Sequence, residues 1–128
     1  MKAILTEKAP KPAGHYSQAI VHHNTVYVSG LLPIDPKTGK KRNGSIEEQT
    51  EQVLSNLSEI LKAAGSNLSQ VIRTTVYITD IELWSRVNAV YARFFGEHRP
   101  ARTVVPTSTL HYGLQVEIEA VAALEKSS

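Results

Sequence analysis

The sequence predicts an α+β fold, a sandwich in which two helices pack on one face of a sheet of about six strands. Extended runs rich in β-branched residues alternate along the chain with two segments that have the spacing of amphipathic helices. The predicted order is strand, strand, strand, helix, strand, helix, strand, strand. With this order both helices can cover one face of a single sheet, because a sheet buries its apolar face against a layer of helices.

Residues 16–29 have the pattern of a β-hairpin. Apolar and polar residues alternate on both sides of His23 and Asn24, and β-branched residues lie on each arm. The next segment, residues 30–44, is predicted to be a loop, because residues that interrupt a regular backbone recur in it. These residues are Pro33, Pro36, Gly39 and Gly44.

The first helix is predicted to begin after Ser45. Ser45 and Glu48 have the spacing of a capping box, in which side chains satisfy free backbone N–H groups of the first turn. Apolar residues then recur at helical spacing until Gly65, which ends the helix. These apolar residues are Ile46, Val53, Leu54, Leu57, Ile60, Leu61 and Ala64.

Residues 71–80 alternate with the period of a strand. One face is expected to carry Ile72, Thr74, Val76 and Ile78, and the other Arg73, Thr75, Tyr77 and Thr79.

A second helix is expected to follow this strand, capped by Asp80 and ending near Gly96. Its predicted apolar face consists of Trp84, Val87, Tyr91, Phe94 and Phe95.

Two extended runs are predicted to complete the chain. The first follows the turn at residues 99–100, and the second is a strand over residues 114–124. On that strand Glu117 and Glu119 share one side with two apolar residues further along. A face that mixes carboxylates with apolar side chains is neither a core face nor a solvent face, so we expect it to meet another subunit.

Length and composition limit the class of protein. The 128 residues fit one compact domain, so a single domain over residues 1–128 is predicted. The absence of cysteine excludes disulfides, thiolate zinc sites and a cysteine nucleophile. The first apolar run, residues 3–5, is too short for a signal peptide or a membrane span, so we expect a cytoplasmic protein that does not contact the membrane.

Charge and motifs narrow the class further. The net charge of +2 comes from mixed signs, and the densest basic run, residues 37–42, contains no aromatic residue, which argues against a nucleic-acid partner. The five histidines lack the spacing of a zinc site, so no metal is expected. There is no GxSxG, Walker or dinucleotide-binding motif.

Five short blocks resemble, in order and spacing, the signatures of the Rid (YjgF) family, which is also described as endoribonuclease L-PSP. The blocks are GHYSQA at 14–19, VYVSG at 26–30, RVNAVYARFF at 86–95, PAR at 100–102 and VEIEA at 116–120. The resemblance implies a chorismate-mutase-like fold and a homotrimer whose sheets line a central barrel. It also implies active sites in the clefts between neighbouring subunits.

The resemblance also implies roles for particular residues. Arg102 would clamp a substrate carboxylate, a task for which a planar, permanently charged guanidinium is suited. Glu117 would hold the attacking water and accept its proton. The remaining positions implied to contact substrate are Tyr16, Ser29, Gly30, Asn88 and Val104.

The chain departs from the family pattern around this site. Val104 stands where well-known deaminases of the family carry a cysteine, although the backbone carbonyl of that position is kept. Leu31 follows Gly30 at a position where glutamine is frequent in the family, and the loop 103–115 differs from the usual family sequence. Within it, His111 and Tyr112 are further candidates for the cleft.

The activity that the resemblance implies is hydrolysis of reactive imines, such as 2-iminobutyrate and 2-iminopropanoate, to 2-oxo acids and ammonia without a cofactor. The imines would be released by pyridoxal-phosphate enzymes. Two alternatives stay open: a non-catalytic trimer that binds small ligands in a regulatory or chaperone-like role, and an endoribonuclease. The ligand-binding role requires no catalysis by Glu117, and the endoribonuclease role predicts a basic cleft.

Overall fold

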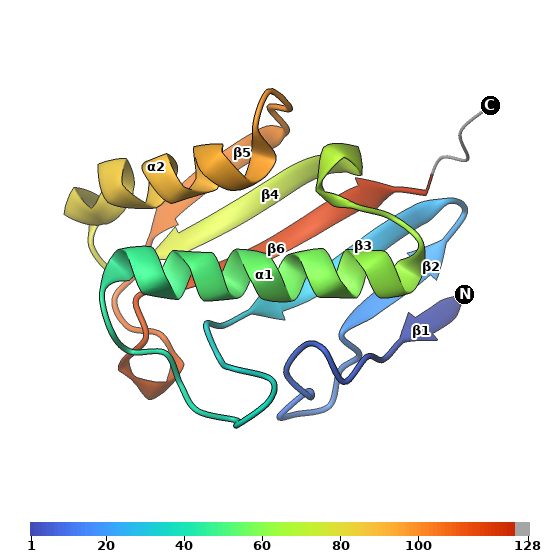
Figure 1. Ribbon diagram of the computed structural model, residues 1–128, viewed down its shortest axis with the longest axis horizontal. Helices are drawn as coiled ribbons and strands as arrows, with labels where there is room; N and C mark the ends of the chain where they lie inside the picture. The colour runs from blue at the N-terminus through green and yellow to red at the C-terminus, as the bar shows by residue number, and fades with distance from the viewer. Residues whose placement is uncertain (125–128) are drawn as a thin grey trace.

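The computed structural model describes residues 1–124, and it confirms the predicted α+β architecture. Six strands form one sheet in the order β1-β2-β3-β6-β4-β5, and both helices lie on the same face of it (Figure 1). Only β4 and β5 run parallel, and the other neighbours are antiparallel. The bounds are β1 Lys2–Ile4, β2 Ala19–His22, β3 Thr25–Leu31, α1 Ile46–Ala64, β4 Val71–Ile78, α2 Trp84–Phe95, β5 Ala101–Pro106 and β6 Val116–Ala123.

The predicted hairpin is β2 and β3, joined at His23 and Asn24. Both turn residues have a positive φ, 47° and 60°, as a type I′ turn requires. The second strand is longer than predicted, because it includes Gly30 and Leu31, which were assigned to the loop. Leu31 pairs with Ile118 of β6, beyond a β-bulge that lies between Val28 and Leu31.

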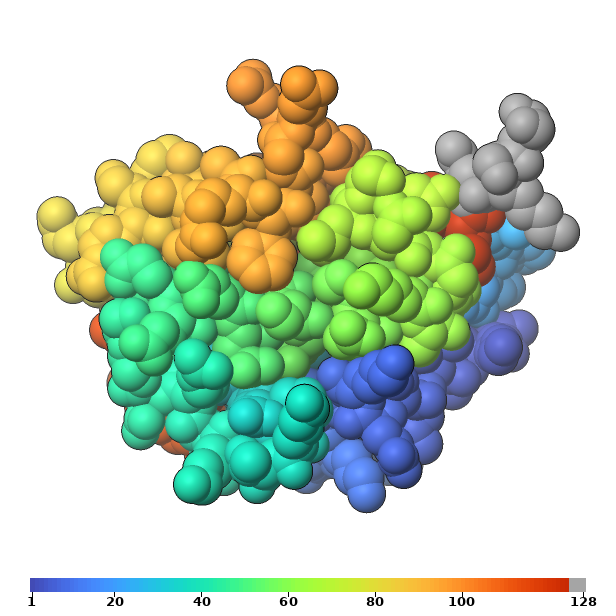
Figure 2. Space-filling view, in the orientation of Figure 1, coloured from blue at the N-terminus to red at the C-terminus, as the bar shows by residue number. Residues whose placement is uncertain are grey.

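Helix α1 begins and ends where the sequence predicts. The Ser45 side chain accepts a hydrogen bond from the Glu48 backbone N–H at 3.1 Å, and Gly65 has a left-handed φ of 88°. The apolar stripe of the helix is buried against the sheet, with Val53, Leu54, Leu57, Ile60 and Leu61 fully covered. Figure 2 shows the molecule from the side of the helices, where α1, α2, the loop after β3 and the N-terminal segment form the surface.

The predicted alternation of β4 is wrong at its start. Ile72 is half exposed, because a register shift between Val71 and Arg73 inserts one residue and turns Ile72 away from the helices. From Thr74 onward the alternation is confirmed: Thr74, Val76 and Ile78 are buried.

The start of the second helix also differs from the prediction. Asp80 caps a short 3₁₀ turn, Ile81–Leu83, and α2 begins after it at Trp84. Trp84 is 40% exposed rather than part of the core, because it lies in the first turn of the helix, near the edge of the sheet. Val87, Tyr91 and Phe95 are buried as predicted, and Phe94 is partly buried.

The last strand begins at Val116, two residues later than predicted, after a 3₁₀ turn at His111–Gly113. It lies between β3 and β4, and Ile118, Ala120 and Ala122 point toward the helices. Glu117 and Glu119 therefore lie on the opposite face of the sheet, which no helix in the described chain covers (Figure 1).

Candidate functional site

Glu117 lies against Gly30 on the face of the sheet without helices. A methyl group added at position 30 would overlap Oε2 of Glu117, so only glycine leaves room for the carboxylate there. Partial burial raises the pKa of the Glu117 carboxyl. Electrostatic interaction with His111 opposes this rise, and interaction with Glu119 adds to it. A raised pKa makes the ionised carboxylate a stronger base, which suits it to proton transfer.

Ser29 ties the strand to the preceding segment. Its hydroxyl donates to the backbone carbonyl of Ser17 at 2.6 Å, and the Ser29 N–H donates to the carbonyl of Gln18 at 3.0 Å. The segment before β2 is held further by Tyr16, whose hydroxyl accepts from the Ala13 N–H at 3.3 Å. Tyr16 remains half exposed, so its hydroxyl can still donate to a ligand.

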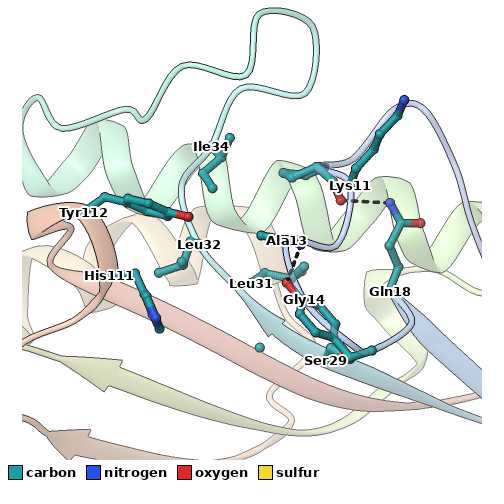
Figure 3. Close-up of a pocket in the computed structure, with 13 residues that line it drawn as sticks. Lys11, Ala13, Gly14, Gln18, Ser29, Leu31, Leu32, Ile34, His111 and Tyr112 are labelled. Atoms are coloured by element: carbon teal, nitrogen blue, oxygen red, sulfur yellow. Dashed lines mark hydrogen bonds between the residues drawn. The ribbon is translucent and has the colours of Figure 1, made fainter.

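A pocket of about 270 Å³ opens beside these residues. Tyr16, Ser29 and Gly30 lie in its wall, and so do His111 and Tyr112 from the turn before β6. Figure 3 shows His111 and Tyr112 on one side of the pocket, with Ser29 and Gly14 on the other. Most of the remaining wall is apolar and is formed by Leu31, Leu32 and Ile34. Glu117 is in contact with Gly30, one of the residues of this wall.

Arg102 is held in a different place, between β5 and α2. Its Nη1 donates to Oδ1 of Asn88 at 2.9 Å. The guanidinium carbon lies 4.8 Å from the ring centroid of Tyr91 and 5.5 Å from that of Trp84, at cation–π distance. Of these residues only Tyr91 is anchored in the core, through a 2.7 Å hydrogen bond to Thr74. Among residues 1–124 the guanidinium makes no other hydrogen bond, so the cation is oriented while its other donors can bind a ligand.

Two further positions implied to contact substrate, Asn88 and Val104, lie beside Arg102. The side-chain oxygen of Asn88 accepts a hydrogen bond from the Arg102 guanidinium, so Asn88 orients the cation. Val104 turns its side chain toward the core, where it lies partly buried in the same small hollow as Arg102 and Asn88. Trp84 and Tyr91 were predicted only as core residues. Their spacing with Asn88, four and three residues along one helix face, is the signal that could have grouped them with Arg102.

Arg102 and Glu117 lie on opposite faces of the sheet. Arg102 pairs with Thr74, which is fully buried beneath α2, and so shares the helical face. Glu117 pairs with Tyr77, which belongs to the other face. The sheet separates the cation from the carboxylate, and a single chain does not bring the two together.

Known proteins resemble this chain over nearly its whole length. The family model described as Endoribonuclease L-PSP matches residues 6–124. A RutC family protein of Pyrococcus horikoshii is 49% identical over 124 residues, which cover 97% of this chain and 98% of that protein. The chain belongs to the Rid (YjgF) family.

Two other Rid relatives carry more specific descriptions. The human 2-iminobutanoate/2-iminopropanoate deaminase is 41% identical over 121 residues, which cover 94% of this chain and 88% of that enzyme. The crystal structure of Escherichia coli TdcF with bound serine has a TM-score of 0.92 and 35% identity, and the match covers 96% of this chain and 98% of TdcF. The fold of the chain is therefore that of the Rid proteins.

Within residues 1–124, no three histidine, aspartate or glutamate side chains cluster closely enough to hold a metal ion. In that same part of the chain, no helix has the length and apolar character needed to cross a bilayer.

Proposed function

We propose that the chain is a cofactor-independent imine deaminase that hydrolyses small 2-imino acids to 2-oxo acids and ammonia. The observation that carries the proposal is the carboxyl of Glu117, whose pKa is raised by burial and which lies against Gly30, in the wall of a pocket that Tyr16 and Ser29 also line. The human relative described as a 2-iminobutanoate/2-iminopropanoate deaminase supports the same substrate class.

Arg102 binds the substrate carboxylate in this proposal. Its guanidinium is pre-oriented by Asn88 and two aromatic rings, so little side-chain freedom is lost on binding. Val104 and Asn88 shape this half of the site. Tyr16, Ser29 and Gly30 line the other half, where a hydroxyl and open backbone can contact the reacting end of the substrate.

Each active site is formed by residues from two copies of the chain. Because the sheet separates Arg102 from Glu117, one substrate can contact both only if a neighbouring copy supplies one of them. A closed ring with a heterologous interface, such as a homotrimer, repeats this pairing at every interface. The mixed polar and apolar face that carries Glu119 and Val121 would then be covered by the ring.

The reaction needs positioning and proton transfer rather than a covalent nucleophile. Water adds to the C=N carbon while Glu117 accepts one of its protons, and the tetrahedral adduct then expels ammonia. General acid–base catalysis contributes roughly 10²- to 10⁴-fold, which is a sufficient range for imines that already hydrolyse in water.

The test couples the purified protein to a threonine dehydratase and follows 2-iminobutyrate by trapping with semicarbazide. Wild type should accelerate hydrolysis, whereas Arg102→Ala and Glu117→Ala should not. No acceleration by wild type would overturn the deaminase proposal. The composite site has its own test: co-assembly of the two inactive variants should restore about a quarter of wild-type activity, because random mixing in a ring recreates intact interfaces.

A non-catalytic ligand-binding role is the second candidate, and the structure of TdcF with bound serine favours it. In that case Glu117→Ala would spare both function and binding of a 2-oxo acid, and wild type would show no turnover. An endoribonuclease, the activity in the family's description, would instead cleave RNA in a manner that depends on basic residues and salt.

A further inference from the structure

His111 lies in the turn before β6, where the chain differs from the Rid pattern. The turn His111–Gly113 places two successive residues in the left-handed region, Tyr112 with φ 62° and Gly113 with φ 70°. A residue with a side chain rarely adopts this conformation, and such residues gather at functional sites. The Leu114 N–H donates a hydrogen bond to the carbonyl of His111 at 3.2 Å, and this bond closes the turn.

His111 lines the pocket beside which the Glu117 carboxylate lies. His111, Ser29 and Gly30 all line the pocket, and Glu117 is in contact with Gly30. Figure 3 shows His111 directed toward the strands rather than outward along the turn. The electrostatic effect of His111 on the pKa of Glu117 is consistent with this proximity.

The rest of the turn is braced from outside the pocket. The Lys41 ammonium lies 4.5 Å from the ring centroid of Tyr112, which links the turn to the loop after β3. The rings of His111 and Tyr112 are 5.9 Å apart. Among residues 1–124, the titratable and charged groups that line the pocket with His111 or act on its members are Lys11, Tyr16, Lys41, Tyr112, Glu117 and Glu119.

We propose that His111 is the second proton-transfer group of this site, acting together with Glu117. This inference rests on the proposed deaminase function. The addition step of imine hydrolysis moves one proton from water and one onto nitrogen, and an ionised carboxylate that accepts the first has no proton of its own to donate. Imidazole is the side chain that ordinarily exchanges protons near neutral pH, so it suits the second role.

The protons balance over two steps. First, the water oxygen bonds to the C=N carbon, Glu117 accepts a water proton, and the imine nitrogen takes a proton from the His111 imidazolium. This gives a carbinolamine. Second, neutral His111 accepts the hydroxyl proton as the C=O bond forms, and protonated Glu117 donates to the nitrogen as the C–N bond breaks. Ammonia and the 2-oxo acid leave, and both side chains return to their first state.

The experiment compares wild type, His111→Gln and the control His23→Gln, which alters the hairpin turn outside the pocket. The pH dependence of kcat is measured with excess dehydratase. We expect His111→Gln to lower kcat roughly 10²-fold and to lose the alkaline limb of the profile, because the first step needs the imidazolium. His111→Ala should be partly rescued by added imidazole. Binding of 2-oxobutyrate, measured by calorimetry, should stay within about twofold for all variants, which shows that they fold and assemble.

Two results would overturn this inference. One is a His111→Gln variant with wild-type kcat and an unchanged profile, while Arg102→Ala and Glu117→Ala remain inactive; the deaminase proposal then stands without His111. The other is a wild type that does not accelerate hydrolysis, which removes both proposals together.

Discussion

Gly30 and Glu117 are in such close contact that a methyl group on Gly30 would overlap Oε2 and would lie 3.3 Å from Cδ of the carboxylate. The overlap involves the far end of a flexible side chain, and the backbone of Gly30 does not need a positive φ. A substitution at position 30 can therefore displace the Glu117 carboxylate without preventing the chain from folding. It tests whether activity depends on the position of the carboxylate.

Gly30→Ala is expected to fold and to lose most deaminase activity. The added methyl group displaces the Glu117 carboxylate, and a displacement of about 1 Å at a reacting group can reduce the rate about 10²-fold. Gly44→Ala is the matched control, because a methyl group there would lie 2.6 Å from Oε2 of Glu48, a carboxylate away from the pocket. Equal activities of the two variants in the dehydratase-coupled assay would contradict the prediction.

Asn88→Ala should weaken substrate binding more than it lowers kcat. The variant removes the 2.9 Å acceptor that orients the Arg102 guanidinium, so the side chain must be ordered when substrate binds, at a cost of about 0.5–1.5 kcal/mol. An increase of KM of roughly two- to tenfold is expected, since each 1.4 kcal/mol is tenfold. Asn88→Asp keeps an acceptor and should preserve the position of Arg102, but its negative charge competes with the substrate carboxylate. Unchanged KM in Asn88→Ala would show that the aromatic rings suffice to orient the cation.

The Thr74–Tyr91 hydrogen bond should stabilise the floor beneath Arg102. Both groups are buried and 2.7 Å apart, so Tyr91→Phe leaves the Thr74 hydroxyl without this partner. A loss of about 1–3 kcal/mol in the free energy of unfolding is expected. Thr74→Val with Tyr91→Phe removes both polar groups and should recover most of that loss in denaturant unfolding. Additive losses in the double variant would contradict the pairing.

Glu117→Gln should raise thermal stability while it abolishes turnover. Burial raises the pKa of Glu117 above its ordinary value of 4.5, so the ionised carboxylate is less favourable in the folded than in the unfolded chain. The cost is absent below about the unfolded pKa and is complete once the pH exceeds the folded pKa. The Tm difference between variant and wild type should therefore be positive at pH 8 and should shrink below pH 5. Glu82→Gln, at an exposed position, is the control. A lower Tm for Glu117→Gln at pH 8 would contradict the sign.

The resemblance and the local patterns predicted different parts of the candidate site. The blocks around Tyr16, Ser29 and Gly30 place three of the implied positions in one pocket, as the structure has them. Asn88 and Val104, also implied as substrate contacts, lie beside Arg102, and their contact with substrate stays a prediction. A motif records which positions matter, whereas the direction of each side chain depends on the pairing of the strands and helix that carry it.

The sequence by itself determined the local elements, because their signals are short-range. The hairpin turn at His23 and Asn24, the Ser45 cap and the apolar stripe of α1 depend on residues within a few positions of one another. Tertiary structure alone decided the bulges at Ile72 and Gly30, the left-handed turn at Tyr112, and the placement of Arg102 and Glu117 on opposite faces. The alternation along a strand predicts which of its residues share a face. It does not predict which strands are neighbours: β6 lies between β3 and β4 through long-range pairing, and that pairing decides which residues of different strands lie on the same face of the sheet.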